Sequence, residues 1–241
     1  MNSAQLLRQG RKIFRFDTFG DEAWWGNTLQ LHQAIEGAKL GGVGPGVSPN
    51  TALAVGLKVD VDALPASVIQ ALQQGQVDLS NPATTLALLR LNSVVGVTGH
   101  FNAEGALSSI GIQCALCHST VDNSFASGIG HRLDGWANRD LNVGVIVSLA
   151  PNLQPIANLL GVDVPTVLKV LNSWGPGKFD AELNLDGQAF RPDAHRTRWF
   201  CHLTMCRPWR KRSSHAALTL QASSWSPSSA IWGSSSLPPN S

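Results

Sequence analysis

The sequence predicts a mainly α-helical domain that contains one small β-hairpin and is followed by a tail of different composition. Three observations predict this class. Apolar residues recur at helical spacing between capping residues, β-branched residues flank a single turn sequence, and the composition changes at about residue 194. With 241 residues and 43% apolar content, the chain can bury one sizeable core. We therefore expect one domain over residues 1–193 and a low-complexity, disordered tail over residues 194–241.

Helices are expected from the start of the chain onward. Residues 3–16 place leucine, isoleucine and phenylalanine at near-helical spacing, with Ser3 available as the N-terminal cap. Residues 21–35 predict a second helix with a broad apolar face. Further helices are expected at 62–75, 81–92, 138–150 and 163–175. The sequence supplies a cap for two of these, because Asn81 is followed by Pro82 and the last helix follows Asp163.

The connecting segments also carry signals. The stretch "LGGVGPGVSPN", residues 40–50, has four glycines but neither G-x-G-x-x-G nor a following Gly-Lys-Ser/Thr, so a plain connecting loop is favoured over a phosphate-binding loop. In residues 94–113, β-branched residues surround the turn sequence "NAEG" and predict the hairpin. Residues 119–130, "STVDNSFASGIG", are typical of a loop.

Charge divides the chain into two parts. Residues 1–193 carry 12 basic and 16 acidic side chains, a net charge of −4, whereas residues 194–241 carry 6 basic and no acidic ones, a net charge of +6. No run of about 18 apolar residues predicts a membrane-spanning helix. The first twenty residues also lack the pattern of a secretory signal peptide.

The last 48 residues fit no ordinary class of segment. They contain 11 serines and four of the eight tryptophans, without helical or strand periodicity. We interpret residues 194–241 as out-of-frame translation, on which selection for folding has not acted. The alternative is a basic arm around residues 207–215 that binds nucleic acid or a membrane surface. We favour the frameshift and expect no nucleic-acid partner.

The motif that carries chemistry is Cys114-Ala115-Leu116-Cys117-His118. A structural zinc site usually has two closely spaced ligand pairs, but the only other cysteines, Cys201 and Cys206, lie more than eighty residues away. A redox dithiol of the thioredoxin type expects a βαβ context, which the helix-rich flanks lack. Covalent haem attachment gives all three residues a role, with Cys114 and Cys117 as thioether anchors and His118 as the iron ligand.

The sixth iron ligand stays open at this stage. The only methionines are Met1 and Met205, the initiator and a residue of the tail. His100 and His131 are the histidines closest in sequence, and an open position is the remaining possibility. His32 lies on an apolar helix face, where a core histidine is expected.

Five stretches of the sequence carry a family resemblance. They are "GRKIFRFDTFGDEAWWGNTLQLHQAIEG", "GPGVSPNTALAVGLKVDVDALP", "GIQCALCHSTVDNSF", "GIGHRLDGWANRDLNVG" and "APNLQPIANLLGVDVPTVLKVLNSWGPGKFDAELNLDG". Over about residues 5–193 the chain resembles bacterial cytochrome c domain proteins, a family loosely related to the di-haem cytochrome c peroxidase type. The resemblance implies an exported haem protein, and longer members continue into a further c-type haem region. It extends to Cys114, Cys117 and His118 and not to catalysis, because this chain has no second C-x-x-C-H.

The resulting expectation is a cytochrome c-like helical haem domain that binds one haem c covalently and transfers single electrons, so an electron carrier is favoured over an enzyme. Redox partner proteins and the cytochrome maturation machinery are the expected partners, and the periplasm is the expected location. Without a signal peptide, either the true start lies upstream or the sequence is an internal fragment. The alternatives are a fragment of a haem-dependent peroxidase or oxidase, and a truncated product without function.

Overall fold

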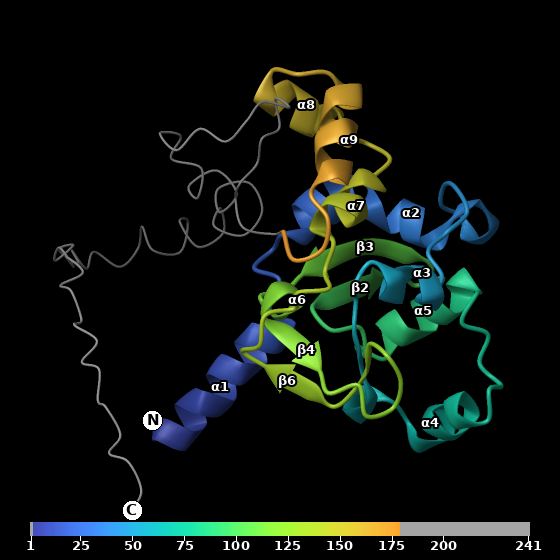
Figure 1. Cartoon of the computed structure of the whole chain (residues 1–241), viewed down its shortest axis with the longest axis vertical. Coiled ribbons are helices and arrows are strands. Elements are labelled where there is room, and N and C mark those ends of the chain that lie inside the picture. Colours follow the sequence, from blue (N-terminus) through green and yellow to red (C-terminus); the bar gives the residue numbers. More distant parts are fainter. Residues whose placement is uncertain (1, 179–241) are drawn as a thin grey trace, which may run out of the picture.

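The structure is a computed structural model that describes residues 2–178 (Figure 1). The α-helices are α1 (Ser3–Phe16), α2 (Leu31–Glu36), α3 (Pro49–Ala54), α4 (Ala66–Gln73), α5 (Pro82–Arg90), α6 (Ala115–His118), α7 (Val143–Ser148), α8 (Gln154–Leu160) and α9 (Val164–Ser173). Shorter turns are the π-helical η1 (Ala23–Thr28) and the 3-10 turns η2 (Ala38–Leu40) and η3 (Val61–Ala63). The strands are β1 (Val59–Asp60), β2 (Val97–Phe101), β3 (Leu107–Ile112), β4 (Ser119–Val121), β5 (Ile129–Gly130) and β6 (Arg132–Asp134). Helices predominate, as predicted. The expected domain end at residue 193 and the tail over 194–241 lie outside the described residues.

The predicted hairpin is confirmed and consists of β2 and β3. The two strands pair antiparallel, with Val97 opposite Ile112. Their connection is the "NAEG" turn, in which the side-chain oxygen of Asn102 accepts a hydrogen bond from the N–H of Ala106 and Gly105 has a φ of +86°. A positive φ is favourable only for glycine and a few short polar residues, so the turn sequence itself specifies this connection.

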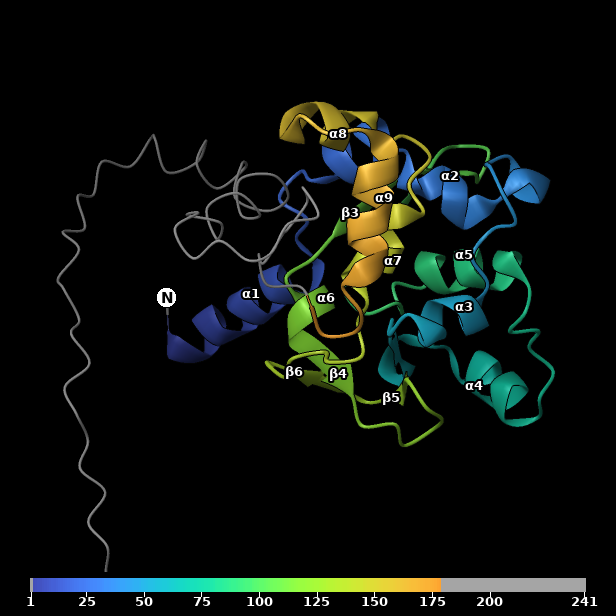
Figure 2. The same cartoon turned by 45° about the horizontal axis from the view of Figure 1, so that its top comes forward.

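Helices surround the hairpin (Figures 1 and 2). The turn η1 and helix α2 pack on β3, α5 packs on β2, and α7 and α8 pack on α9. The largest fully buried apolar side chains are Leu29, Leu107, Ile110, Leu141 and Val167. They come from four separate segments, because Leu107 and Ile110 both lie on β3, and each contributes about 1.5–3 kcal/mol through its burial. The hairpin is therefore enclosed in one core that extends from η1 to α9.

Two of the predicted N-terminal caps, Asn81 and Asp163, are confirmed, whereas Ser3 lies inside α1 and Asn2 caps that helix by accepting a hydrogen bond from the N–H of Gln5. The side chain of Asn81 accepts a hydrogen bond from the N–H of Ala83 at the start of α5, where Pro82 occupies the first turn. The side chain of Asp163 accepts one from the N–H of Thr166 at the start of α9. A side-chain cap satisfies one of the four N–H groups that a helix leaves unpaired at its start. The starts of α5 and α9 can therefore be predicted from the sequence.

The predicted single helix over residues 21–35 is wrong. The segment divides into η1 and α2, because Gln30 adopts a left-handed backbone with a φ of +58°. At Gly26, η1 approaches β3 so closely that a Cβ would lie 1.6 Å from the Oγ of Ser109. Tertiary packing against the hairpin thus overrides the local helical pattern.

Two other predicted helices are also shorter in the structure than in the prediction. The helix expected at 138–150 covers only α7, and the one expected at 62–75 covers only α4. The segment 119–130, predicted as a loop, contains β4 and β5, whose partners β6 and β1 lie elsewhere in the chain. Strands of two or three residues are too short for alternation to reveal them.

The glycine-rich segment, residues 40–50, forms turns that lead into α3, as expected for a connecting loop. None of the helices in residues 2–178 is long and apolar enough to cross a membrane.

Candidate cofactor-binding site

The cysteine motif forms one short turn, α6, directly after β3. Cys114 precedes it with a right-handed helical backbone, φ −52° and ψ −31°. Successive residues of such a turn are rotated by about 100°. In an ideal turn with this rotation, Cys114, Cys117 and His118 span an arc of about 100°. In the structure Ala115 and Leu116 are 0% and 6% exposed, Cys117 is half-buried and packs against the core, Cys114 is half-buried and His118 is exposed.

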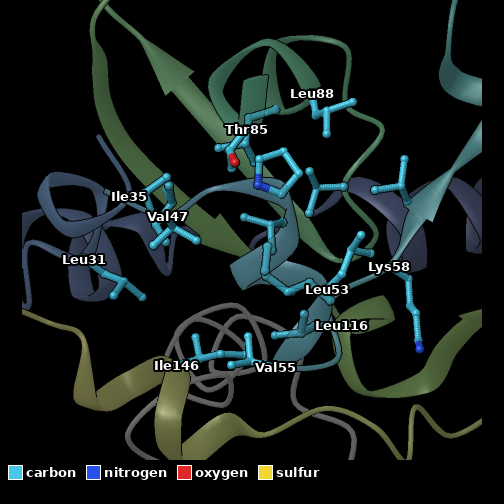
Figure 3. Close-up of a pocket in the computed structure, with 18 of the residues that line it drawn as sticks. Leu31, Ile35, Val47, Leu53, Val55, Lys58, Thr85, Leu88, Leu116 and Ile146 are labelled. Atoms are coloured by element: carbon cyan, nitrogen blue, oxygen red, sulfur yellow. The ribbon is translucent and has the colours of Figure 1, made fainter. Parts of the chain in front are cut away.

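The inner side of α6 is held by the core. Leu116 lines an apolar cavity of about 70 Å³ beside the hairpin and α3 (Figure 3). Behind it, Gly96 lies against the backbone of Leu116 with a φ of +82°, and its carbonyl accepts a hydrogen bond from the N–H of Gln113. The position of α6 is therefore determined by contacts that the motif alone does not reveal.

The outer side is held by the segment after β6. The N–H of Asn138 donates to the carbonyl of Cys117 at 2.9 Å, and the N–H of Gly135 donates to the carbonyl of His118 at 2.8 Å. The side chain of Asn138 is 1% exposed and donates to the carbonyl of Gly56. Both ends of the turn are thus fixed through hydrogen bonds to the backbone.

The two cysteines are free thiols and half-buried. Burial raises the pKa of Cys117 to about 11, with a further increase from the charge of Cys114. Burial also raises the pKa of Cys114, and the nearby charges of Asp17 and Asp21 add to this effect. At pH 7 only roughly one Cys117 in ten thousand is then a thiolate, the form that reacts in disulfide exchange. A redox dithiol requires the opposite shift, so these environments do not favour that alternative.

A buried carboxyl group, Asp21, lies on the other side of the β3–α6 junction. One of its oxygens accepts a hydrogen bond from the Nε1 of Trp25 at 3.1 Å, and the other accepts one from the N–H of Ile112 at 3.0 Å. Asp21 is 4% exposed, and burial raises its pKa from 3.8 to about 7. The sequence reasoning missed this residue, although the four-residue separation of Asp21 and Trp25 is the spacing at which helical side chains meet.

A cluster of charges joins α1 to β6 and β4. Asp134 Oδ2 accepts a hydrogen bond from Arg15 Nε at 2.7 Å, and Asp134 Oδ1 accepts one from the hydroxyl of Ser119. Arg132 Nε lies 3.0 Å from Asp134 Oδ1 in an ion pair whose angle is not that of a hydrogen bond, and its side chain is only 4% exposed. Because Ser119 directly follows the motif, this cluster anchors the strand that leaves α6.

The two histidines considered as sixth ligands lie before and after α6, on β2 and between β5 and β6. His100 pairs in register with Ser109, five residues before Cys114, which corresponds to about 16 Å along a strand. The carbonyl of His131 accepts a hydrogen bond from the N–H of Asp122, four residues after His118 or about 13 Å along the chain. His131 Nδ1 lies 2.8 Å from a carboxylate oxygen of Asp62, whose hydrogen bond and charge raise the pKa of His131.

The donor set on α6 fits a covalently attached haem. Two free thiols and one imidazole lie within a single turn, in which the cysteines are half-buried and His118 is exposed. The indole of Trp136, which follows Gly135, is 66% exposed. In the described part of the chain, no three side chains of the His, Cys, Asp and Glu types converge to hold a metal ion.

Comparison with known proteins adds no neighbour. No protein-family model, curated protein or solved structure matches this chain. The resemblance to cytochrome c domain proteins therefore stays a prediction, and the residues of α6 and their surroundings are the basis for the function proposed below.

Proposed function

We propose that the domain binds one haem c covalently and transfers single electrons. Cys114 and Cys117 would anchor the group through thioether bonds, and an imidazole nitrogen of His118 would bind the iron. The observation that supports this proposal is that Cys114, Cys117 and His118 lie within one helical turn, in which Ala115 and Leu116 are buried while Cys114 and His118 are more accessible. When bound, the haem supplies an iron that cycles between the ferric and ferrous states.

The residues around α6 have definable roles in this proposal. Burial holds both sulfurs as thiols, which are the groups that add to the vinyl substituents. The hydrogen bonds to the carbonyls of Cys117 and His118 orient the turn before attachment. Exposed apolar side chains on α1, β6 and the following segment offer surface for an apolar macrocycle: Ile13, Phe16, Leu133 and Trp136.

Haem c attachment takes place outside the cytoplasmic membrane in bacteria, which gives the proposal a location and partners. We place the functional protein in the periplasm, with the cytochrome maturation machinery acting on it first and redox partner proteins afterwards. The exposed position of His118 supports exchange of electrons with a partner at the surface.

Haem staining of a denaturing gel tests the proposal. We expect the full chain, coexpressed with a cytochrome maturation system, to carry one haem per chain that survives denaturation. Cys117→Ala should abolish the two-thioether product, because one anchor is missing. The matched control is the double variant Cys201→Ser/Cys206→Ser, which removes the cysteines outside the motif and should stain as the wild type does. A colourless wild-type chain that is folded and soluble contradicts the proposal.

One observation favours a second candidate function, a fragment of a haem-dependent peroxidase or oxidase. His100 and His131 have hydrogen-bonding or ladder partners of their own, since His100 pairs with Ser109 and His131 Nδ1 lies 2.8 Å from Asp62, so this candidate assigns neither of them to the iron. We expect cyanide and carbon monoxide to change the absorption spectrum of the haem-loaded chain, and His100→Ala and His131→Ala to leave that change intact. A spectrum that neither molecule alters would indicate a strong sixth ligand and exclude this candidate.

A further inference from the structure

We propose that Asp21 takes up a proton when the site gains an electron, so that this carboxyl group couples electron transfer to proton transfer. The inference rests on the proposed haem attachment. In balanced form, one electron from a one-electron carrier protein enters the site, and one proton from solvent binds a carboxylate oxygen of Asp21. Both leave again when the site is oxidised.

Geometry places Asp21 next to the site but outside it. Its carboxylate accepts from the N–H of Ile112, which is separated from Cys114 by one residue, Gln113. A Cβ on Gly111 would lie 3.2 Å from Asp21 Oδ1, so the strand backbone passes directly against the carboxyl group. At 4% exposure, Asp21 is shielded from water, and charge added at the motif is therefore weakly screened.

The charged groups around Asp21 leave its protonation state sensitive to a negative charge added at the motif. Burial is the largest influence on the pKa of Asp21 and raises it to about 7, while the hydrogen bonds from Ile112 and Trp25 lower it and the charge of Glu22 raises it. Cys114 faces it from the β3–α6 side, where Asp17 also acts on the thiol. None of these three ionisable neighbours is a cation that would hold Asp21 ionised.

The expected effect has a definite sign. An electron adds one negative charge to the site, and a neighbouring carboxylate then binds its proton more tightly. Reduction is therefore favoured at low pH and opposed at high pH. The reduction potential should therefore fall between pH 5 and pH 9, and each tenfold change in the proton affinity of Asp21 on reduction corresponds to about 59 mV for one electron.

Electrochemical titration of the haem-loaded full chain against pH tests the proposal. The wild-type potential should fall with pH around neutrality, and Asp21→Asn should remove most of that dependence. Glu22→Gln, one residue further along the same turn, is the matched control and should retain it. Trp25→Phe removes a hydrogen bond that lowers the pKa of Asp21, so it should move the dependence to higher pH. A flat wild-type profile, or an unchanged slope in Asp21→Asn, overturns the inference.

Chemical denaturation of the haem-free full chain gives an independent readout. Because folding raises the pKa of Asp21 above its unfolded value of 3.8, its contribution to stability is fully present below about pH 3.8 and is lost as the pH rises through 7. The folding equilibrium of the wild type should therefore weaken relative to Asp21→Asn between these values, by on the order of a hundredfold or more. If the variant fails to fold, the carboxyl resonance of Asp21 in the wild type and in Trp25→Phe reports the same titration.

These readouts separate the two proposals. A chain that titrates at Asp21 but carries no covalent haem contradicts the proposed function and, with it, the coupling. A haem-loaded chain whose potential ignores pH contradicts the coupling alone.

Discussion

Replacing Gly96 with alanine should destabilise the domain by about 3 kcal/mol or more, and it should reduce covalent haem although every residue of the C-x-x-C-H motif is retained. Gly96 has a φ of +82°, and a Cβ there would lie 2.2 Å from the Cα of Leu116. The left-handed backbone costs a residue with a Cβ about 1–2 kcal/mol, and overpacking adds about 1–3 kcal/mol. The atom that must move belongs to the backbone of α6. Urea denaturation and haem staining measure the two effects.

Gly75→Ala is the matched control for this substitution. Gly75 also has a positive φ, +66°, but a Cβ there meets nothing within 4 Å. Only the backbone cost of about 1–2 kcal/mol should appear, with full haem attachment. If the two variants lose equal stability, the close approach of Gly96 to Leu116 has no energetic importance.

Replacing Asp134 with alanine should destabilise the domain by about 3–5 kcal/mol, because it leaves the guanidinium of Arg132 buried without its nearest anion. Arg15 would lose its 2.7 Å hydrogen bond to the same carboxylate, so the contact between α1 and β6 should weaken as well. The urea midpoint measures the loss. Burial raises the pKa of Asp134, but the hydrogen bond from Arg15 and the charge of Arg132 outweigh it, and the net pKa is lowered.

The pH dependence and two further variants test the cause of this loss. A lowered folded pKa means that Asp134 contributes its stability above the unfolded pKa of about 3.9 and loses it as the pH falls through the folded value. The difference between wild type and variant should therefore shrink in acid. Arg11→Ala should cost no more than about 1 kcal/mol, since Arg11 is exposed and 3.9 Å from the carboxylate. Asp134→Ala/Arg132→Met should recover stability relative to Asp134→Ala, and a double variant as unstable as the single one would contradict a buried-charge origin.

Local signals in the sequence were sufficient for some elements. The caps Asn81 and Asp163 and the "NAEG" turn act within a few residues, so their hydrogen bonds recur in the structure as predicted. The helix predicted in residues 3–16 is also observed, although it begins one residue earlier than the predicted cap Ser3 implies. Such elements depend on neighbours in sequence, and for that reason sequence is enough to locate them.

The elements that sequence reasoning missed depend on distant partners. The helix expected over residues 21–35 is interrupted where Gly26 meets Ser109, 83 positions away. Asp21 looks like an ordinary acidic residue at a helix start, and only the approach of β3 buries it and raises its pKa. Arg132 and Asp134 look like surface charges until α1 covers them.

The sequence by itself determined the chemistry available to this protein: two thiols and an imidazole at a spacing for which covalent haem is the proposed use. Spacing along five residues is a local property, and no folding is needed to recognise it. Only the tertiary structure decided how these groups are presented. Contacts with the core bury Ala115 and Leu116 and half-bury Cys117, while His118 stays exposed. The approach of β3 encloses Asp21 and raises the pKa of its carboxyl group. Burial and long-range pairing arise from contacts between remote segments, which a pattern in one segment does not contain.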